Sequence, residues 1–180
     1  MLYKGSTKIA DVYHGSTKIK EIYHGSTLVY SAGYPSGTIL FENSAAGTYT
    51  LQVDYDCTIH LDLVGGGGYG LVINGGEGAY ISGDMALTAG TYTIVIGRGG
   101  STQSGTLVGD DSTFENNIAG GGKNGGLSSG GEGGTATVVT QGLIGQNGGN
   151  RDTTGWINGY GAGGSNNGDG VDGYCKIEVV

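Results

Sequence analysis

Glycine limits what this chain can fold into more than any other residue does. It supplies 42 of the 180 residues, whereas glycine ordinarily makes up about 7% of a protein. The stretch GGLSSGGEGG at 125–134 is typical of the region from about 119 to 173, where apolar side chains are few. Each glycine loses more backbone freedom on folding than any other residue and has no side chain to bury. This region therefore either remains as flexible loops or is stabilised by contacts of its backbone.

Small residues recur at every third position of the glycine-rich region. Polyproline II has three residues per turn and a rise of about 3.1 Å per residue, so this spacing places one glycine edge along a helix. Segments 122–134 and 161–173 have 13 residues each and would span roughly 40 Å. Their backbone groups would bond to neighbouring helices. We favour such packed polyglycine-II-type segments over flexible loops. The in-phase residues are Gly122, Gly125, Ser128, Gly131 and Gly134; Gly142, Gly145 and Gly148; and Gly161, Gly164, Gly170 and Gly173.

The first 30 residues repeat with a period of ten, as MLYKGSTKIA, DVYHGSTKIK and EIYHGSTLVY. The Gly-Ser pairs suit two-residue hairpin turns, and the intervening residues, such as 17–24, favour strands. We expect a short β-meander over residues 1–33 that serves as an anchor or oligomerisation segment. His14 and His24 recur before the turns. A metal site is conceivable there, and a simple preference for a polar residue is favoured.

The remainder, residues 34–180, is expected to form a glycine-rich β domain. Alternating apolar residues predict strands over 48–55, 58–64 and 91–96, and the last strand, 173–180, is expected to join the sheet. Cys57 and Cys175 are in phase with apolar neighbours, which predicts two core thiols. Pro35 predicts a turn in the loop at 31–38. The predicted fold class is all-β.

Charge and hydropathy exclude several classes of partner. The net charge is −8, which argues against nucleic acid and against an anionic membrane surface. Apolar runs are too short for the roughly 20 residues that span a bilayer, so membrane insertion is not expected. The N-terminal residues lack the continuous apolar stretch of a signal peptide.

Catalytic and cofactor motifs are also missing from the sequence. Residues 65–70, GGGGYG, follow a predicted strand but precede no helical pattern that would bind a phosphate. Asp110, Asp111 and Glu115 lack the spacing of an EF-hand loop. We therefore expect neither an enzyme nor a cofactor or metal site.

Binding is the favoured class of activity, and residues 147–170 contain the chain's single tryptophan. An aromatic plane flanked by polar groups can hold a sugar ring, because the ring face stacks and the hydroxyls find hydrogen-bond partners. Trp156 either serves in this way or packs inward against the sheets, and both interpretations stay open. The candidate ligand-binding residues are Arg151, Asp152, Trp156, Asn158 and Tyr160.

The repeats in GSTKIKEIYHGSTLVYS resemble short Tyr-x-Gly-Ser-Thr repeats near one end of phage and prophage tail proteins. The stretches LVGGGGYG and ALTAGTYTIVIGRGG, with the closing GYGAGGSNNGDGVDGYCKIEVV, resemble the glycine-rich domain of phage tail fibres and adhesins. A similar arrangement in some animal receptor ectodomains implies a jelly-roll-like β-sandwich combined with packed polyglycine helices.

The resemblance implies a virion protein of a phage tail, made in the bacterial host cytoplasm and assembled as a homotrimer. Its N-terminal repeats would contact other virion proteins, and its irregular C-terminal loops would contact a glycan or protein of the host cell surface. The alternative is a purely structural tail or capsid-decoration protein without a host ligand. Ice binding is a weaker third option, against which the irregular side chains speak.

Overall fold

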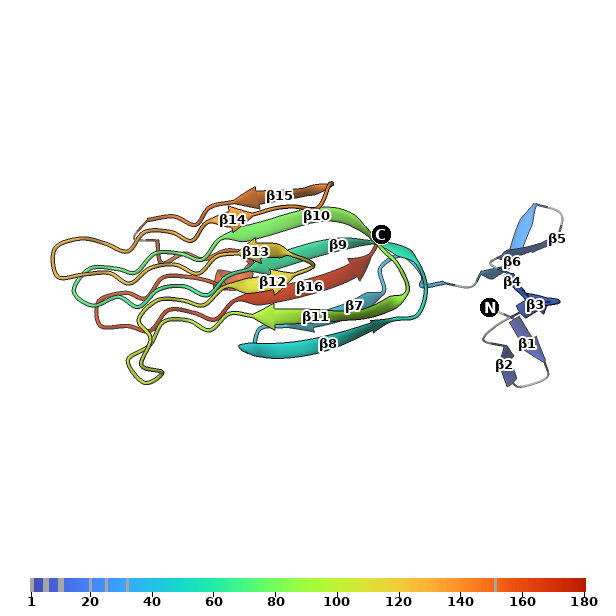
Figure 1. Cartoon of the computed structure of the whole chain (residues 1–180), viewed down its shortest axis with the longest axis horizontal. Coiled ribbons are helices and arrows are strands. Elements are labelled where there is room, and N and C mark those ends of the chain that lie inside the picture. Colours follow the sequence, from blue (N-terminus) through green and yellow to red (C-terminus); the bar gives the residue numbers. More distant parts are fainter. Residues whose placement is uncertain are drawn as a thin grey trace.

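The computed structural model describes residues 2–4, 7–9, 12–19, 21–24, 26–31, 33–150 and 152–180. Within these ranges the regular secondary structure is all β, apart from one 3₁₀ turn, η1 (Ile157–Gly159). Figure 1 shows the longer strands in two packed layers, which continue at one end into extended segments without strand arrows. The predicted all-β fold class is confirmed.

The ten-residue repeats form three separate hairpins rather than the expected meander. In the second hairpin Gly15 and Ser16 make the turn, and Gly15 has a φ of 65°, which glycine adopts without strain. Residues 17–24, expected as one strand, are divided between two hairpins, with 17–19 in one and 21–24 in the next. The pairs are β1 (Leu2–Lys4) with β2 (Thr7–Ile9), β3 (Val12–His14) with β4 (Thr17–Ile19), and β5 (Glu21–His24) with β6 (Thr27–Ser31).

Two five-stranded antiparallel sheets pack face to face as a β-sandwich. The first sheet has the order β15-β10-β9-β16-β7 and the second has the order β14-β13-β12-β11-β8. The first sheet comprises β7 (Ile39–Asn43), β9 (Cys57–Val64), β10 (Tyr80–Leu87), β15 (Leu143–Gln146) and β16 (Tyr174–Val179). The second comprises β8 (Gly47–Val53), β11 (Gly90–Ile96), β12 (Ser112–Phe114), β13 (Asn117–Ala119) and β14 (Ala136–Thr137).

Alternation along the strands builds the core between the two sheets. Ile59, Leu61 and Leu63 of β9 are fully buried, and Ile94 and Ile96 of β11 face them from the second sheet. Burial of one such side chain contributes roughly 1.5–3 kcal/mol. The predicted strands over 48–55, 58–64 and 91–96 are confirmed, with ends shifted by one or two residues.

The two cysteines and the last strand also lie where the sequence predicts. Cys175 is completely buried, and Cys57 is half-buried and packs against the same core. The last strand, β16, pairs with β7 on one side and β9 on the other, which places it inside the sheet. At the beginning of the domain Thr38 donates its backbone N–H to the Pro35 carbonyl, and this closes the predicted turn.

The glycine-rich segments form a bundle held together by backbone hydrogen bonds, and residues 65–70 lie at its centre. Successive N–H groups of this segment donate to three different neighbours in a repeat of three. Gly65 and Gly68 donate to segment 75–79, Gly66 and Tyr69 donate to segment 107–111, and Gly67 and Gly70 donate to segment 168–173. The acceptors lie 2.8–3.0 Å away. A repeat of three is the geometry of a three-residue helix, and not of a strand, whose neighbours alternate in a repeat of two.

The carbonyl groups of the central segment accept hydrogen bonds from three further neighbouring segments. Segment 120–126 donates to the carbonyls of Gly66 and Tyr69, while Gly100 donates to Gly67 and Gly164 donates to Gly68. The central segment therefore lies among six others, and one of them, 168–173, both accepts from it and donates to it. This arrangement satisfies backbone groups that would otherwise be buried without partners. The bundle thus has a core of hydrogen-bonded backbone.

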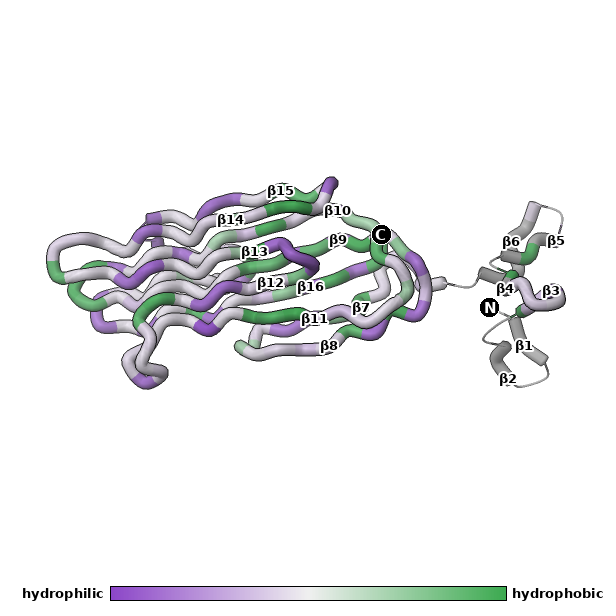
Figure 2. The backbone as a smooth tube through the Cα atoms, in the orientation of Figure 1, coloured by the Kyte–Doolittle hydropathy of each residue, from purple (hydrophilic) through white to green (hydrophobic). Residues whose placement is uncertain are grey.

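The close packing of the bundle leaves no room for a side chain at the central glycines, Gly65–Gly68. A Cβ atom added to Gly65, Gly66, Gly67 or Gly68 would lie 1.9–2.4 Å from a backbone oxygen of a neighbouring segment. Figure 2 shows the consequence, because this half of the domain is mostly pale while hydrophobic residues concentrate in the strands. Glycine is abundant here because at these positions a Cβ atom would collide with the backbone of a neighbouring segment.

The extent of the glycine segments differs from the prediction in four ways. Segment 122–134 is not one 13-residue helix: it reverses at 126–129, and its two halves pair through bonds such as Lys123 N–H to Glu132 O. Segment 161–173 likewise reverses at 165–168. The run at 142, 145 and 148 is not one helix: Gly145 lies in β15, whereas Gly148 donates to Gly134 in the bundle. The bundle also includes residues before 119, which the sequence analysis left outside it. Short, reversing segments suffice because each one gains its bonds from its neighbours.

Candidate functional site

Trp156, the centre of the predicted binding region, is engaged with the protein itself. Its indole Nε1–H donates to the carbonyl of Gly78 at 2.7 Å, and its ring stacks on Tyr80 with the centroids 5.2 Å apart. Gly78 belongs to bundle segment 75–79 and Tyr80 begins β10, so the indole joins the bundle to the outer face of the first sheet. The side chain is half-buried, which leaves part of it accessible.

Tyr160 lies over the outer face of the same sheet. Its ring stacks on Tyr174 of β16, with a centroid distance of 4.7 Å and an interplanar angle of 2°. The Tyr174 hydroxyl in turn donates to Glu42 Oε1 at 2.7 Å. Burial, followed by the hydrogen bond to Glu42, raises the pKa of Tyr174. Residues 156–160 therefore place two aromatic rings on this face, each already stacked on a second ring.

The other predicted site residues are less closely associated. Asp152 accepts hydrogen bonds from the N–H and the hydroxyl of Thr154 at 2.8 and 2.5 Å, and these bonds lower the pKa of its carboxyl group. Asn158 is exposed and has a φ of 53°, a left-handed conformation that asparagine tolerates. Arg151 lies outside the described residues. The structure thus brings the aromatic members to one sheet face, and the ligand-binding role of the set stays a prediction.

A chain of polar side chains crosses the outer face of β9 and β10. Asp62 Oδ1 accepts the hydroxyl protons of Tyr80 at 2.5 Å and Ser82 at 2.9 Å. Ser82 Oγ also lies 3.1 Å from His60 Nε2, and His60 Nδ1 lies 2.6 Å from Asp84 Oδ1. Burial and the bond to Asp62 raise the pKa of Tyr80 to about 12. The cluster links β9 and β10, because the residues it joins lie directly opposite each other in the two strands: Ser82 is paired with Asp62, and Asp84 with His60.

The connection from Ser82 through His60 to Asp84 has the order of a catalytic triad, which the sequence analysis did not anticipate. The surroundings do not suit acyl transfer. Strands β9 and β10 are interior strands of the sheet, so their N–H groups bond within the ladder. An oxyanion hole needs such donors free. In addition, the Asp62 carboxylate beside Ser82 would repel a developing oxyanion. We assign this cluster to sheet pairing, and the absence of enzyme activity stays a prediction.

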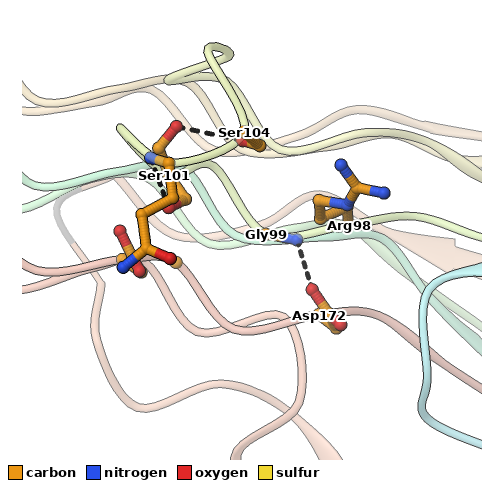
Figure 3. A pocket seen from close by; sticks show the side chains of 8 residues that line it. Arg98, Gly99, Ser101, Ser104 and Asp172 are labelled. Atoms are coloured by element: carbon orange, nitrogen blue, oxygen red, sulfur yellow. Dashed lines mark hydrogen bonds between the residues drawn. The ribbon is translucent and has the colours of Figure 1, made fainter.

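A shallow polar depression lies where the bundle meets the loop after β11 (Figure 3). Its volume is about 400 Å³. Asp172 Oδ1 accepts the Gly99 N–H at 2.7 Å, while Figure 3 shows the Arg98 guanidinium directed away from that carboxylate. The side chains that line the depression are Arg98, Ser101, Gln103, Ser104, Asp169 and Asp172.

The sequence analysis missed most of this depression. The loop GRGGSTQSGT at 97–106 lies between glycine segments, and Arg98 is one of only eight cationic residues in the chain. An isolated arginine beside a Ser-Thr-Gln-Ser stretch is a usable signal of a polar binding loop. Asp169 and Asp172, which line the depression with Arg98, are distant from it in sequence, and the bundle alone brings them near.

Metal and phosphate chemistry finds no support in the described part of the chain. No group of three or more His, Cys, Asp or Glu side chains is placed there to hold a metal ion. Asp111 instead accepts the Gly121 N–H at 2.9 Å. The N–H groups of 65–70 are used in the bundle, so GGGGYG does not cradle a phosphate. Among the described residues there is also no helix with the length and apolar character to cross a membrane.

Two turns at the free end of the bundle expose apolar side chains. Val72 is 50% exposed and Leu127 is 74% exposed. Their turns are tied together by the bond from Ile73 N–H to Gly126 O at 3.3 Å. Figure 2 shows hydrophobic colour at this end, beyond the pale bundle.

Comparison with protein-family models and with curated proteins gave no match to this chain. Its function is therefore inferred from the residues and geometry described above.

Proposed function

We propose that this chain is an adhesion protein of a bacteriophage virion, a tail-fibre tip or receptor-binding component that contacts a glycan or protein of the host surface. One observation carries the proposal. The chain enters the sandwich at residues 33–38, and the bundle extends from the opposite end, with its turns at the tip (Figure 1). A rigid scaffold that carries irregular turns away from its attachment point suits recognition.

The N-terminal repeats then provide attachment to other virion proteins. Each hairpin is an isolated two-stranded sheet, and such hairpins are only marginally stable alone in water. Pairing with equivalent hairpins of further copies would cover their edges, and we propose a homotrimer on this basis. Light scattering on the purified full chain tests it: a mass three times that of the chain is expected, and a monomeric mass would contradict it.

Binding of the fluorescently labelled full chain to a panel of bacterial strains tests the adhesion proposal. We expect saturable binding to a subset of strains, and competition with adsorption of phage to those strains. The same chain unfolded and refolded serves as a control for the native fold. Binding to virion components, with none to any cell, would favour the alternative of a purely structural tail or capsid-decoration protein.

The accessibility of Trp156 decides whether the predicted residues Asp152, Trp156, Asn158 and Tyr160 belong to the contact surface. The chain has a single tryptophan, so its fluorescence reports this position alone. Acrylamide quenches the fluorescence of an accessible tryptophan. If a bound host glycan suppresses this quenching, Trp156 belongs to the contact surface. Quenching that no host extract changes would leave Trp156 as a packing residue and direct attention to other surfaces.

A further inference from the structure

The depression around Arg98 has a floor of rigid backbone. Gly100 donates its N–H to Gly67 in the centre of the bundle at 2.8 Å, and Gly170 donates to Gly100 at 2.9 Å. A Cβ atom on Gly99 would lie only 2.0 Å from the Gly170 oxygen. The segments that carry Arg98 and Asp169 are therefore locked together at Gly99, Gly100 and Gly170. The backbone below a ligand would need no ordering on binding, whereas the uncommitted side chains of Arg98 and Gln103 would.

Three side chains on this floor have no partner within the described chain. Lys123 pairs with Glu132 at 2.6 Å and Lys176 pairs with Glu178 at 2.5 Å. Arg98, in contrast, forms none of the described ion pairs or side-chain hydrogen bonds. The side-chain amide of Gln103 and the carboxylate of Asp169 are equally uncommitted among the described residues. The depression thus presents an unpaired donor, an unpaired acceptor and an amide that supplies both.

The balance of charge around the depression disfavours an anionic ligand. One guanidinium and two carboxylates line it, within a chain of net charge −8. An anion would be repelled by the excess of negative charge, and a cation would meet the Arg98 guanidinium. A sugar hydroxyl both donates and accepts, so a neutral sugar matches the mixed lining. The volume of about 400 Å³ falls at the small end of the usual range for ligand sites.

We propose that this depression binds one neutral sugar residue of a host surface glycan, through the side chains of Arg98, Gln103 and Asp169. This inference rests on the proposed adhesion function and names its ligand class. Aromatic rings are absent from the lining, so recognition depends on hydrogen bonds to hydroxyl groups. Affinity for a single sugar is accordingly weak, and several copies in an oligomer would strengthen attachment.

Titration of the full chain with glucose, galactose, mannose and N-acetylglucosamine, followed by amide NMR shifts, tests the site. We expect saturable shifts with at least one of these sugars, centred on Gly99, Ser101, Gln103 and Gly170. Glucuronic acid is expected to bind more weakly than glucose. Arg98→Gln and Asp169→Asn should each weaken binding about tenfold, because each removes a charge-assisted hydrogen bond. Lys123→Gln, which alters an exposed lysine elsewhere, should leave the affinity unchanged.

The outcomes separate failure of this site from failure of the adhesion function. Unchanged NMR spectra outside the depression show that the variants fold. If the native chain binds cells and both variants bind them equally well, the site is wrong and adhesion stands. If no neutral sugar produces saturable shifts, or if Arg98→Gln binds sugar as tightly as the native chain, the inference is overturned. Tighter binding of glucuronic acid would overturn the ligand class.

Discussion

Substitution of Gly67 by alanine tests the close packing of the bundle. The new Cβ atom would lie 1.9 Å from the Ala162 oxygen and 2.7 Å from the Gly161 oxygen. Since Cβ atoms essentially never approach closer than 3.0 Å, segment 161–164 would have to move by about 1.1 Å, the difference between 3.0 and 1.9 Å. Such a movement would break backbone bonds such as Gly164 N–H to Gly68 O at 2.7 Å.

The expected cost of Gly67→Ala follows from these contacts. Loss of two or three hydrogen bonds at about 1 kcal/mol each, together with overpacking of about 1–3 kcal/mol, gives a loss of roughly 3–6 kcal/mol. Alanine has less backbone conformational freedom than glycine in the unfolded chain, and this offsets about 0.4–1 kcal/mol of the lost stability. The net loss of roughly 2–5 kcal/mol is a large part of the 5–15 kcal/mol typical of a folded protein.

Gly90→Ala is the matched control, because the nearest atom to its new Cβ would be 3.8 Å away. Guanidinium unfolding followed by Trp156 fluorescence measures both variants. We expect Gly90→Ala to lie within about 0.5 kcal/mol of the native chain or slightly above it. Equal stability of Gly67→Ala and Gly90→Ala would refute the packed-backbone description.

Three further predictions concern buried polar groups and thiols. Burial raises the pKa of Glu77 above 4.5, so the stability contributed by its protonated form is present below pH 4.5 and lost as pH rises through the raised value. Glu77→Gln should therefore gain stability relative to the native chain between about pH 4 and pH 7. Urea unfolding of both chains across this range measures the difference in their free energies of unfolding, and a difference that does not change with pH would contradict the prediction. Trp156→Phe should lose about 1–2 kcal/mol, measured by circular dichroism, because the Gly78 carbonyl loses its donor; unchanged stability would show that the indole bond is dispensable. Cys175 is fully buried with a raised pKa, so a thiol reagent should modify it only on unfolding; rapid modification of the native chain would be inconsistent with its place in the core.

The sandwich could be predicted from the sequence because its strands carry strict alternation. Successive side chains of a strand point to opposite faces of the sheet, so Leu61 and Val53 lie inward while their neighbours His60 and Gln52 lie outward. The principle of the bundle was also predictable, because in-phase glycines such as Gly122 and Gly125 do donate to carbonyls three residues apart in one neighbour. Periodicity within a window thus identified the kind of packing.

The arrangement of the bundle could not be predicted in the same way. A three-residue period continues unchanged through a turn, so it gave no sign that the chain reverses near Ser128 and Asn167. The central position of residues 65–70 depends on six segments spread over about a hundred residues, and no local pattern encodes it. The depression at Arg98 has the same origin, since the bundle alone brings residues 98–104 to 169–172.

Amide hydrogen exchange of the native full chain, read by peptide mass spectrometry, tests the hydrogen-bonded bundle most directly. Segments 65–70, 75–79 and 120–126 have no regular strand ladder, yet most of their N–H groups donate to backbone carbonyls at 2.6–3.1 Å. We predict protection in these segments comparable with that of β9 and β16, and fast exchange in the turn at 102–105. Exchange of the glycine segments at the rate of an unfolded chain would contradict the account.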